Sequence, residues 1–224
     1  MKITVNFAMS LDGKISLKGK RVRLSCIEDK KRVHLMRNKA DAILVGINTV
    51  ITDDPKLTVK KDYIYEVKSY EYETKNPLRV ILDGKLRIPE NARLLTMPGK
   101  TIIFALSDFK EKTNVRRKLK SLEKYKNTSV KFTGEKKGLI DLHDVISTLS
   151  HMGIETLMVE GGATIISSFV EENLADEIFI YISPKIIGPD GITFVKQKVD
   201  IESNYVIKKS QIIGEGNLIK LERR

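Results

Sequence analysis

The adjacent carboxylates Asp53 and Asp54 are the first residues whose placement suggests chemistry. They belong to the stretch VGINTVITDDPKLTV, residues 45–59, in which an apolar strand is expected to run into a turn ahead of Pro55 and Lys60. Neighbouring carboxylates repel each other, so the pair is either solvated in a loop or used by a ligand site. By itself the stretch is compatible with both interpretations.

A second candidate is the stretch MVEGGATIISSF, residues 158–169. A strand is expected to end at Glu160, followed by two glycines and a helix that begins at Ala163 or Thr164. Glycine lets a backbone approach a ligand closely, and the amides at a helix N-terminus favour a phosphate. A tight strand–helix turn explains the two glycines equally well. Glu160 is more informative, because ligands of open α/β sheets bind at the carboxyl ends of the strands.

The tripeptide Asp-Gly-Lys occurs twice, at 12–14 and at 83–85, each time after an expected strand. Each copy alone is typical of a simple turn. Because the carboxyl ends of parallel strands meet at one edge of a sheet, the two turns are expected to converge there. Two weak signals therefore indicate the same edge as Glu160.

Other reactive side chains form no recognisable constellation. His34, His143 and His151 lie on separate helical stretches without metal-ligand spacing, and we interpret them as structural or solvated. The single cysteine, Cys26, excludes an intramolecular disulfide and a cysteine-based zinc cluster, and we expect a small buried residue without a partner. Arg37 falls in the last turn of a helix, where a cation stabilises the helix dipole. The sequence predicts no metal site.

Alternating strands and helices must position these residues. Residues 3–7 alternate between apolar and polar and open the chain as a strand. Ser25 with Glu28 three residues later is a capping-box pattern that starts a helix through Arg37. Further strands are expected at 41–46, 76–84, 100–106, 129–132, 155–162 and 176–188, and further helices at 109–125, 139–153 and 163–174.

This order of elements predicts an α/β protein with a largely parallel central sheet and helices on both faces. Residues 205–222 are expected to add an antiparallel hairpin that turns at GEGN. We see no repeat or linker and expect one domain over residues 1–224. The segment 62–75 holds four of the seven tyrosines and is compatible with a hairpin insertion, an edge strand or a subunit contact.

The net charge of +11 raises the question of nucleic-acid binding. The basic residues are, however, spread along the chain and interleaved with acids, without the aromatic spacing of a single-strand platform. The charge fits equally well a pocket for phosphorylated ligands. No apolar run approaches the roughly 18 residues that span a bilayer, and the N-terminus lacks the apolar core of a signal peptide, so we expect a cytoplasmic protein without a membrane partner.

Five stretches together resemble the reductase family of riboflavin biosynthesis, in the family's order and over most of the chain. The pattern G-x-x-T-V-x-x-D-D-P-x-L-T is the most specific of their features and separates this family from ordinary dihydrofolate reductases. The resemblance implies the three-layer, dihydrofolate-reductase-like fold. The stretches are MSLDGK at 9–14, residues 37–59, NPLRVILDGKLRIP at 76–89, VEGGATI at 159–165 and DEIFIYISPKIIG at 176–188.

The resemblance also implies an NAD(P)H-dependent enzyme that reduces the ribosylamino side chain of a pyrimidine 5′-phosphate to ribitylamino. Asp53 would then be the active member of the carboxylate pair, and Asp54 would shape the turn before Pro55. The residues expected to bind the cofactor are Thr49, Asp53, Leu82, Asp83, Gly84, Lys85, Gly161, Gly162, Ala163 and Thr164. Those expected to face the substrate are Asn6, Lys14, Arg37, Leu57, Lys60 and Glu160, with Arg37 and Lys60 suited to its phosphate.

The chemistry needs a proton on the departing ring oxygen of the ribosylamine and a hydride on the imine carbon. Lys14 and Glu160 are the candidate catalytic residues for the proton, and the sequence does not choose between them. NADPH is the expected cofactor, with NADH also compatible. Family members are commonly homodimers, and the apolar strand within 176–188 is a candidate interface.

Two departures bear on the substrate. The chain shows no H-x-E or P-C-x-x-C pattern of the zinc deaminase that bacterial members carry. A reductase of this kind resembles the archaeal and fungal branch, whose substrate is 2,5-diamino-6-ribosylamino-4(3H)-pyrimidinone 5′-phosphate. The alternatives are a 5-amino-6-(5-phosphoribosylamino)uracil reductase and, more distantly, a basic nucleotide- or RNA-binding module. Second, residues Arg21 to Arg23 fall in a loop that contributes to ligand contacts in relatives, and its basic character leaves those contacts open.

Overall fold

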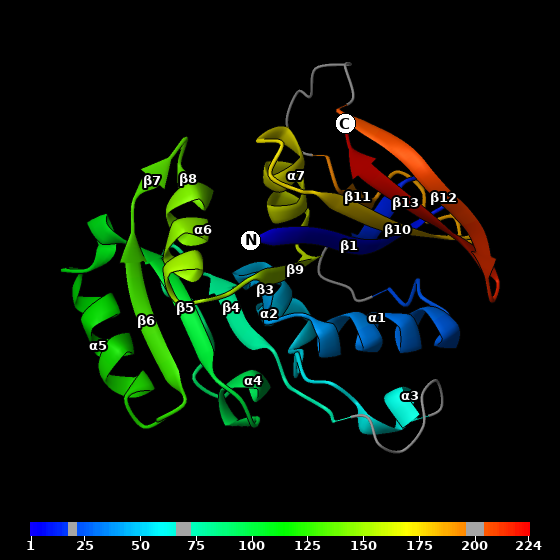
Figure 1. Cartoon of the computed structure of the whole chain (residues 1–224). Coiled ribbons are helices and arrows are strands. Elements are labelled where there is room, and N and C mark those ends of the chain that lie inside the picture. The colour runs from blue at the N-terminus through cyan, green and yellow to red at the C-terminus, as the bar shows by residue number, and fades with distance from the viewer. Residues whose placement is uncertain (18–21, 66–72, 196–203) are drawn as a thin grey trace.

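The computed structural model describes residues 1–17, 22–65, 73–195 and 204–224. Its centre is a nine-stranded sheet with the strand order β12-β13-β10-β1-β9-β3-β4-β5-β6 (Figure 1). From one edge to the other, these strands are β12 (Tyr205–Ile213), β13 (Gly216–Arg223), β10 (Glu177–Ser183), β1 (Lys2–Ser10), β9 (Thr156–Gly161), β3 (Ala42–Gly46), β4 (Leu78–Leu82), β5 (Thr101–Leu106) and β6 (Thr128–Thr133).

The strands from β10 to β6 run parallel, whereas β13 and β12 are antiparallel and form the closing hairpin. This arrangement confirms the predicted largely parallel sheet with a C-terminal antiparallel hairpin. It also changes one expectation. The apolar strand β10 pairs with β1 on one side and β13 on the other, so its main chain offers no free edge to a second subunit.

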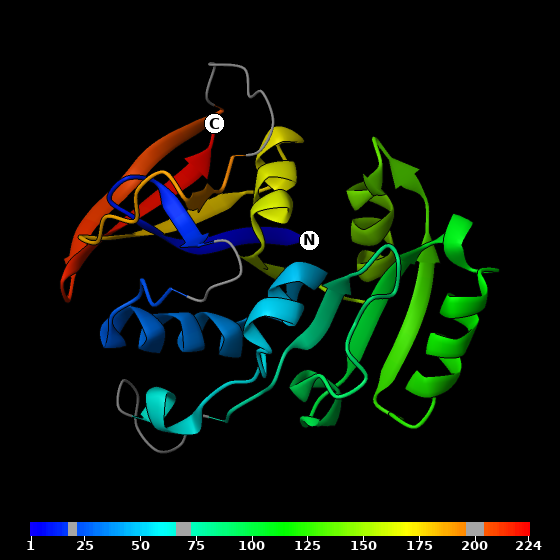
Figure 2. The same ribbon diagram turned by 180° about the vertical axis from the view of Figure 1, so that it is seen from behind.

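Helices cover both faces of the sheet (Figures 1 and 2). On one face, α6 (Leu142–His151) and α7 (Ala163–Glu171) pack on a core that includes Val5, Val159 and Phe104. On the other, α2 (Ile47–Asp53), α4 (Arg93–Thr96) and α5 (Thr113–Leu122) cover a second core. The three-layer prediction is therefore confirmed. No helix in the described part of the chain is long and apolar enough to cross a membrane.

Helix α1 (Ile27–Lys39) also lies on the second face, but its buried residues are the polar Asp29 and Asn38. It starts one residue later than the Ser25 capping box predicts. Cys26 is the N-cap, and its Sγ accepts a hydrogen bond from the Asp29 amide at 3.4 Å. The thiol also donates to the Ile213 carbonyl at 3.6 Å. Cys26 is thus half-buried and partnered, contrary to the expectation.

Asp53 is the last residue of a helix and Asp54 is its C-cap, where a strand followed by a turn was expected. Ile47 and Val50 lie one helical turn apart, and both are buried in the second core. Their burial stabilises residues 47–53 as a helix although the segment is short. Asp54 ends α2 in the left-handed conformation, with φ +40°, and its Oδ1 accepts the Arg93 amide at 2.8 Å. Pro55 follows it, as it often follows a helix end. The role predicted for Asp54, shaping this turn, is confirmed.

The remaining elements are short. They are β2 (Lys14–Leu17), α3 (Lys61–Tyr65), η1 (Ser107–Phe109), β7 (Glu135–Lys136), β8 (Leu139–Ile140) and β11 (Gly191–Thr193). Strand β2 pairs with β11, and β7 pairs with β8. The tyrosine-rich segment begins in α3, but most of it, residues 66–72, lies outside the described residues, so its role stays a prediction.

Candidate active site

A cavity of about 790 Å³ opens at the carboxyl edge of the parallel strands. The ends of β1, β4, β5 and β9 contribute to its wall, as do the first turns of α2 and α7 and strands β2 and β8. Its size falls within the range of cavities that bind small molecules and cofactors, about 300–1,000 Å³. The edge predicted from the two Asp-Gly-Lys turns and Glu160 is therefore the hollowed edge of the sheet.

The N-terminus of α7 faces this cavity. Gly161 and Gly162 have φ values of +148° and +58°, which disfavour side chains at both positions. A Cβ on Gly162 would also lie 3.3 Å from the Thr49 Oγ1. Gly162 is the N-cap and gives α7 no side-chain cap, so the first amides of the helix have no intrahelical partner. Unpartnered helix amides and bare glycine backbone are suited to a phosphate.

Nearly all predicted cofactor residues meet at this cavity although they come from three separate parts of the chain. Because their strands are parallel and neighbouring, β3, β4 and β9 deliver them to one place. The predicted residues that line the cavity are Thr49, Asp53, Leu82, Gly84, Lys85, Gly161, Gly162, Ala163 and Thr164, together with Glu160.

Asp83 is the exception among them. Its side chain is fully buried, and its Oδ2 accepts the Ile88 amide at 2.7 Å, which closes the turn after β4. Burial raises the pKa of this carboxyl group above its usual value. Its Oδ1 has no hydrogen-bond partner among the described residues. Asp83 therefore shapes the turn from inside the fold and is not part of the cavity lining.

Glu160 forms a bidentate ion pair with Arg37 of α1. The Arg37 Nε and Nη2 atoms donate to the two carboxylate oxygens at 2.6 Å and 2.5 Å, and Nη1 donates to the Thr58 carbonyl at 3.2 Å. Burial alone would lower the pKa of Arg37, but the Glu160 carboxylate outweighs it and raises that pKa. Both oxygens of Glu160 accept hydrogen bonds in this arrangement, so Arg37 fixes the orientation of the carboxylate at the cavity wall.

The end of α1 also positions the segment after Leu57. His34 Nδ1 accepts the Lys60 amide at 3.1 Å, and the Lys60 ammonium lies 4.9 Å from the centre of the Tyr63 ring. Burial, with the nearby charges of Arg37 and Lys60, lowers the pKa of His34 to about 4. His34 is therefore structural, as predicted. Leu57 is buried in the second core and is not part of the cavity lining.

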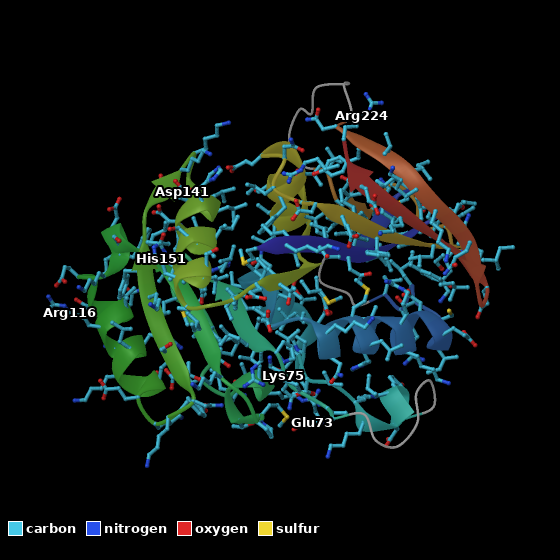
Figure 3. All side chains as sticks on the ribbon, viewed as in Figure 1. Glu73, Lys75, Arg116, Asp141, His151 and Arg224 are labelled. Carbon is cyan, nitrogen blue, oxygen red and sulfur yellow. The ribbon has the colours of Figure 1, made fainter. Side chains whose placement is uncertain are left out.

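The other two histidines are both exposed and lie on α6, at whose end Figure 3 labels His151. His151 Nδ1 contacts the Ser147 carbonyl at 2.8 Å, and His143 lies 3.2 Å from Glu172. Within the described residues no three His, Cys, Asp or Glu side chains gather closely enough to hold a metal ion.

Asn6 lies in a polar layer between β1 and α1, and the cavity lining does not include it. Arg32 Nη2 donates to the Asn6 Oδ1 at 2.6 Å, and Arg32 Nε donates to Asp29 at 2.9 Å. The guanidinium also lies 5.5 Å from the centre of the Phe179 ring. Sequence reasoning missed Arg32, although its spacing from Asp29, three residues along a helix, indicates such a pair.

Lys14 begins β2 and does not line the cavity, whereas the three residues after it do. Its amide donates to the Ser10 Oγ at 2.9 Å, and Ser10 donates to Asp12 Oδ1 at 2.5 Å. Asp12 also accepts the amides of Ile187 and Gly188 at 3.1 Å and 2.7 Å. The Ser10 hydroxyl and the Gly188 amide lower the pKa of Asp12 to about 2. This exposed carboxylate therefore fixes the loop that carries Lys14.

The apolar part of the cavity was not predicted. The apolar lining residues that no prediction named include Phe7, Ile15, Leu17, Val22, Leu24, Ile165 and Ile192. Strands β2 and β11 supply several of these side chains, and both are too short to give a clear periodic signal. Arg87 and Asn48 also line the cavity. Both lie inside the stretches that carry the family resemblance, but no role was assigned to either of them.

Fold and cavity together define a three-layer α/β protein with a ligand site at the carboxyl edge of a mainly parallel sheet, a class that includes many nucleotide-binding enzymes. Residues 1–219 match the RibD C-terminal domain family. The chain belongs to this family.

The relatives agree with this assignment. The chain is 40% identical over 222 residues to the 2,5-diamino-6-ribosylamino-4(3H)-pyrimidinone 5′-phosphate reductase of Archaeoglobus fulgidus, covering 96% of this chain and 94% of the relative. It is 34% identical to the protein of that name from Methanothermobacter thermautotrophicus, covering 97% and 96%. The crystal structure of a pyrimidine reductase-like protein from Corynebacterium diphtheriae has a TM-score of 0.81 at 16% identity, covering 100% of this chain and 92% of that one, and shows the same fold.

Proposed function

We propose that this chain, as a single reductase domain, reduces the ribosylamino side chain of 2,5-diamino-6-ribosylamino-4(3H)-pyrimidinone 5′-phosphate to ribitylamino with NADPH. The observation that carries the proposal is the position of Glu160. It lines the cavity beside the Gly161–Gly162 turn and is held from the other face of the sheet by Arg37. A reductase needs such a junction, because cofactor and substrate must meet at one point.

The residues of the cavity fit a nicotinamide dinucleotide. Gly161, Gly162 and the unpartnered amides at the start of α7 are suited to its diphosphate. Thr49 and Asp53 lie on the wall formed by α2. Phe7 of β1 and Ile15 of β2 line the cavity with apolar side chains, which would exclude water from that side of the site.

The nicotinamide, when bound, supplies the hydride; the chain must orient the substrate and manage a proton. Near the end of α1, Lys60 is the exposed cation that we propose for the substrate phosphate. Arg37 already binds Glu160 and the Thr58 carbonyl, and neither cation is part of the cavity lining. Glu160 lines the cavity and is held by Arg37, so we assign it the orientation of the substrate. Lys14 lies directly before the cavity-lining residues 15–17, and we assign to its ammonium group the proton on the departing ring oxygen. Lys14→Gln should then lower kcat more than it raises KM, and Glu160→Gln should do the reverse.

The test of the function is oxidation of NADPH, followed by its absorbance, with the diaminopyrimidinone and the uracil ribosylamino phosphates in parallel. Oxidation with the first and not the second supports the proposal. Oxidation with only the second would identify a uracil reductase. Oxidation with neither, in protein shown to be folded, would contradict the reductase function, and steeply salt-dependent binding of generic RNA would then favour the binding-module alternative.

We also propose that the protein acts as a homodimer. The support is the outer strand β12, which has one unpaired edge among the described strands and carries Ile207 and Ile212 at 66% and 84% exposure. Exposed apolar residues on a free edge favour pairing with another chain. Light scattering of the purified protein tests this proposal. A mass of one chain would contradict it. If the wild type has the mass of two chains, Ile212→Lys should shift the protein towards the monomer.

A further inference from the structure

The positive charge of the chain is concentrated at one margin of the sheet. Residues 110–131 hold nine lysine or arginine residues and only two acids, so this segment carries +7 of the net charge of +11. It comprises α5 and part of β6, the last strand of the sheet. Figures 1 and 2 place α5 at the outer end of the molecule, opposite the hairpin of β12 and β13. The fold therefore gathers a surplus of charge that the interleaved acids of the sequence do not balance.

Helix α5 directs its cations away from the fold. Its apolar side chains recur every three or four residues and pack on the second core at Val115, Leu119 and Leu122. At 100° per residue, Arg117 and Lys120 project from the opposite side of the helix, and both are exposed. The exposed Lys124 follows one turn after Lys120 and continues the row. Arg117, Lys120 and Lys124 together form the basic face of α5.

Few carboxylates neutralise the basic face. Within the described residues, the ion pairs of segment 110–131 join Arg116 to Glu111 and Lys118 to Glu90. The three cations of the basic face form no ion pair in the part of the chain that the structure describes. They lie close together on one helix, so a polyanion that binds there would relieve their mutual repulsion.

The same surface offers little apolar area. In the described residues, the large hydrophobic side chains that are exposed all lie outside 110–131. The rings of Tyr125 and Phe132 are half-buried, and the Tyr125 hydroxyl donates to the Glu90 carbonyl at 2.5 Å. Helices that bind membrane surfaces insert apolar side chains, and the cores of protein–protein interfaces are rich in aromatic residues. The basic face is therefore suited to a partner that presents charge alone, as a nucleic-acid backbone does.

Duplex DNA fits this face better than other nucleic acids. Single strands are bound by stacking on exposed aromatic rings, which segment 110–131 lacks among its described side chains. The major groove of B-DNA is about 12 Å wide and admits an α-helix, whose diameter is about 10–12 Å. The major groove of A-form RNA is deep and too narrow for side chains to read.

We propose that the basic face of α5, flanked by the exposed Arg116 and Lys126, binds the backbone of duplex DNA without sequence preference. This surface is separate from the candidate active site, since none of these five side chains lines the cavity. The interaction goes beyond the proposed reductase function and does not depend on it.

Fluorescence anisotropy of a labelled DNA duplex, titrated with the intact protein, tests the surface. If the five cations each neutralise one phosphate, the slope of log K against log salt is about −4 to −5, and the affinity falls about 10²- to 10³-fold between 50 and 200 mM salt. Two duplexes of unrelated sequence should bind within about twofold of each other. The triple variant Arg117→Gln, Lys120→Gln, Lys124→Gln should make the slope shallower by about 3 and weaken binding about tenfold or more.

The matched control is the triple variant Lys39→Gln, Lys208→Gln, Lys209→Gln. It removes the same charge from exposed positions on α1 and β12 and should keep the affinity for the duplex within about threefold. Both triple variants should unfold in urea as the wild type does, because all six side chains are exposed.

Equal weakening by both triple variants would overturn the proposal, because it would show attraction to the net charge alone. Tighter binding of the wild type to duplex RNA, to single-stranded DNA or to vesicles of anionic lipid than to duplex DNA would also overturn it. Absence of salt-dependent binding of the DNA duplex by folded protein would do the same.

Discussion

Arg37 and Glu160 lie 123 residues apart in the chain, yet they form a two-bonded ion pair at 2.6 Å and 2.5 Å. Their side chains are only 16% and 11% exposed. One residue comes from α1 and the other from the end of β9, so the pair ties a polar helix to the edge of the sheet where the cavity opens. The predicted substrate residue and the predicted catalytic residue are thus already bound to each other.

Replacing one member should leave the other charge buried without a partner. Glu160→Leu is expected to lower the free energy of unfolding by about 3–5 kcal/mol, as measured by urea denaturation. The double variant Arg37→Met with Glu160→Leu should regain most of that loss, because it removes both charges and keeps the volume filled.

The ion pair between Glu111 and Arg116 is the matched control, because both side chains are largely exposed, at 71% and 66%. Arg116 projects from the outer side of α5 (Figure 3). Glu111→Leu should change the free energy of unfolding by no more than about 1 kcal/mol. An equal loss for both glutamate variants would show that burial of the Arg37 pair has no energetic consequence.

Gly162→Ala should weaken binding of the dinucleotide. Gly162 is the N-cap of α7, and a side chain at its φ of +58° is strained. The added Cβ would also lie 3.3 Å from the Oγ1 of Thr49 in α2. We expect a loss of about 1 kcal/mol of stability and a rise of about tenfold in the Kd for NADP⁺, measured by titration calorimetry.

Gly153→Ala provides the comparison for backbone strain alone. Gly153 also has a positive φ, +80°, but nothing lies within 4 Å of its Cβ position, and it is not part of the cavity wall. Its variant should lose similar stability and keep the wild-type Kd. If both variants weakened NADP⁺ binding equally, the Gly162 turn would have no special place in the site.

The sequence predicted the positions of the strands better than it predicted the contacts of individual side chains. The strands expected at 155–162 and 76–84 are present as Thr156–Gly161 and Leu78–Leu82, because apolar runs and glycines mark parallel strands clearly. The helix of residues 47–53 was missed because it depends on the burial of Ile47 and Val50 in the second core, which the local sequence does not show. Sequence position placed Asp83 at the cavity, but only the packing of the turn shows that its side chain faces inward.

The contact partners of the long polar side chains could not be predicted from the sequence either. Arg32 contacts Asn6 from 26 positions away, and no local pattern encodes which strand residue a helical arginine meets. Lys85 and Lys112 both lie at the ring of Phe109, although they come from two loops that the parallel strands β4 and β5 bring together. Sequence periodicity gives elements and faces, whereas such meetings follow from the register between strands.

His34 should make stability depend on pH in the weakly acidic range. Its pKa is about 4 in the folded protein and about 6.5 when unfolded. Between these values the unfolded chain binds more protons, so the free energy of unfolding rises with pH. The contribution is complete above about pH 6.5 and is lost as the pH falls towards 4. Allowing for partial exposure, the change is about 1–2 kcal/mol, measurable by urea unfolding at several pH values.

Other groups titrate in the same range, so the diagnostic quantity is the difference between wild type and His34→Gln. That variant should be flatter between pH 4 and pH 6.5. His143→Gln, an exposed histidine on α6, should follow the wild-type curve. A His34→Gln curve that is parallel to the wild type would contradict the buried, neutral state of His34.

Asp12 should control the loop that carries Lys14. Asp12→Asn removes the carboxylate that accepts from Ser10, Ile187 and Gly188 and so loosens β2 from the loop after β10. Faster amide hydrogen exchange is expected in residues 12–17, together with a several-fold lower kcat.

Asp41→Asn is the matched control, since Asp41 accepts the Glu155 and Thr156 amides at the amino end of β9. It should raise exchange there and leave kcat unchanged, because that end of the sheet lies away from the cavity. Unchanged exchange at residues 12–17 in Asp12→Asn would show that strand pairing with β11 alone holds the loop.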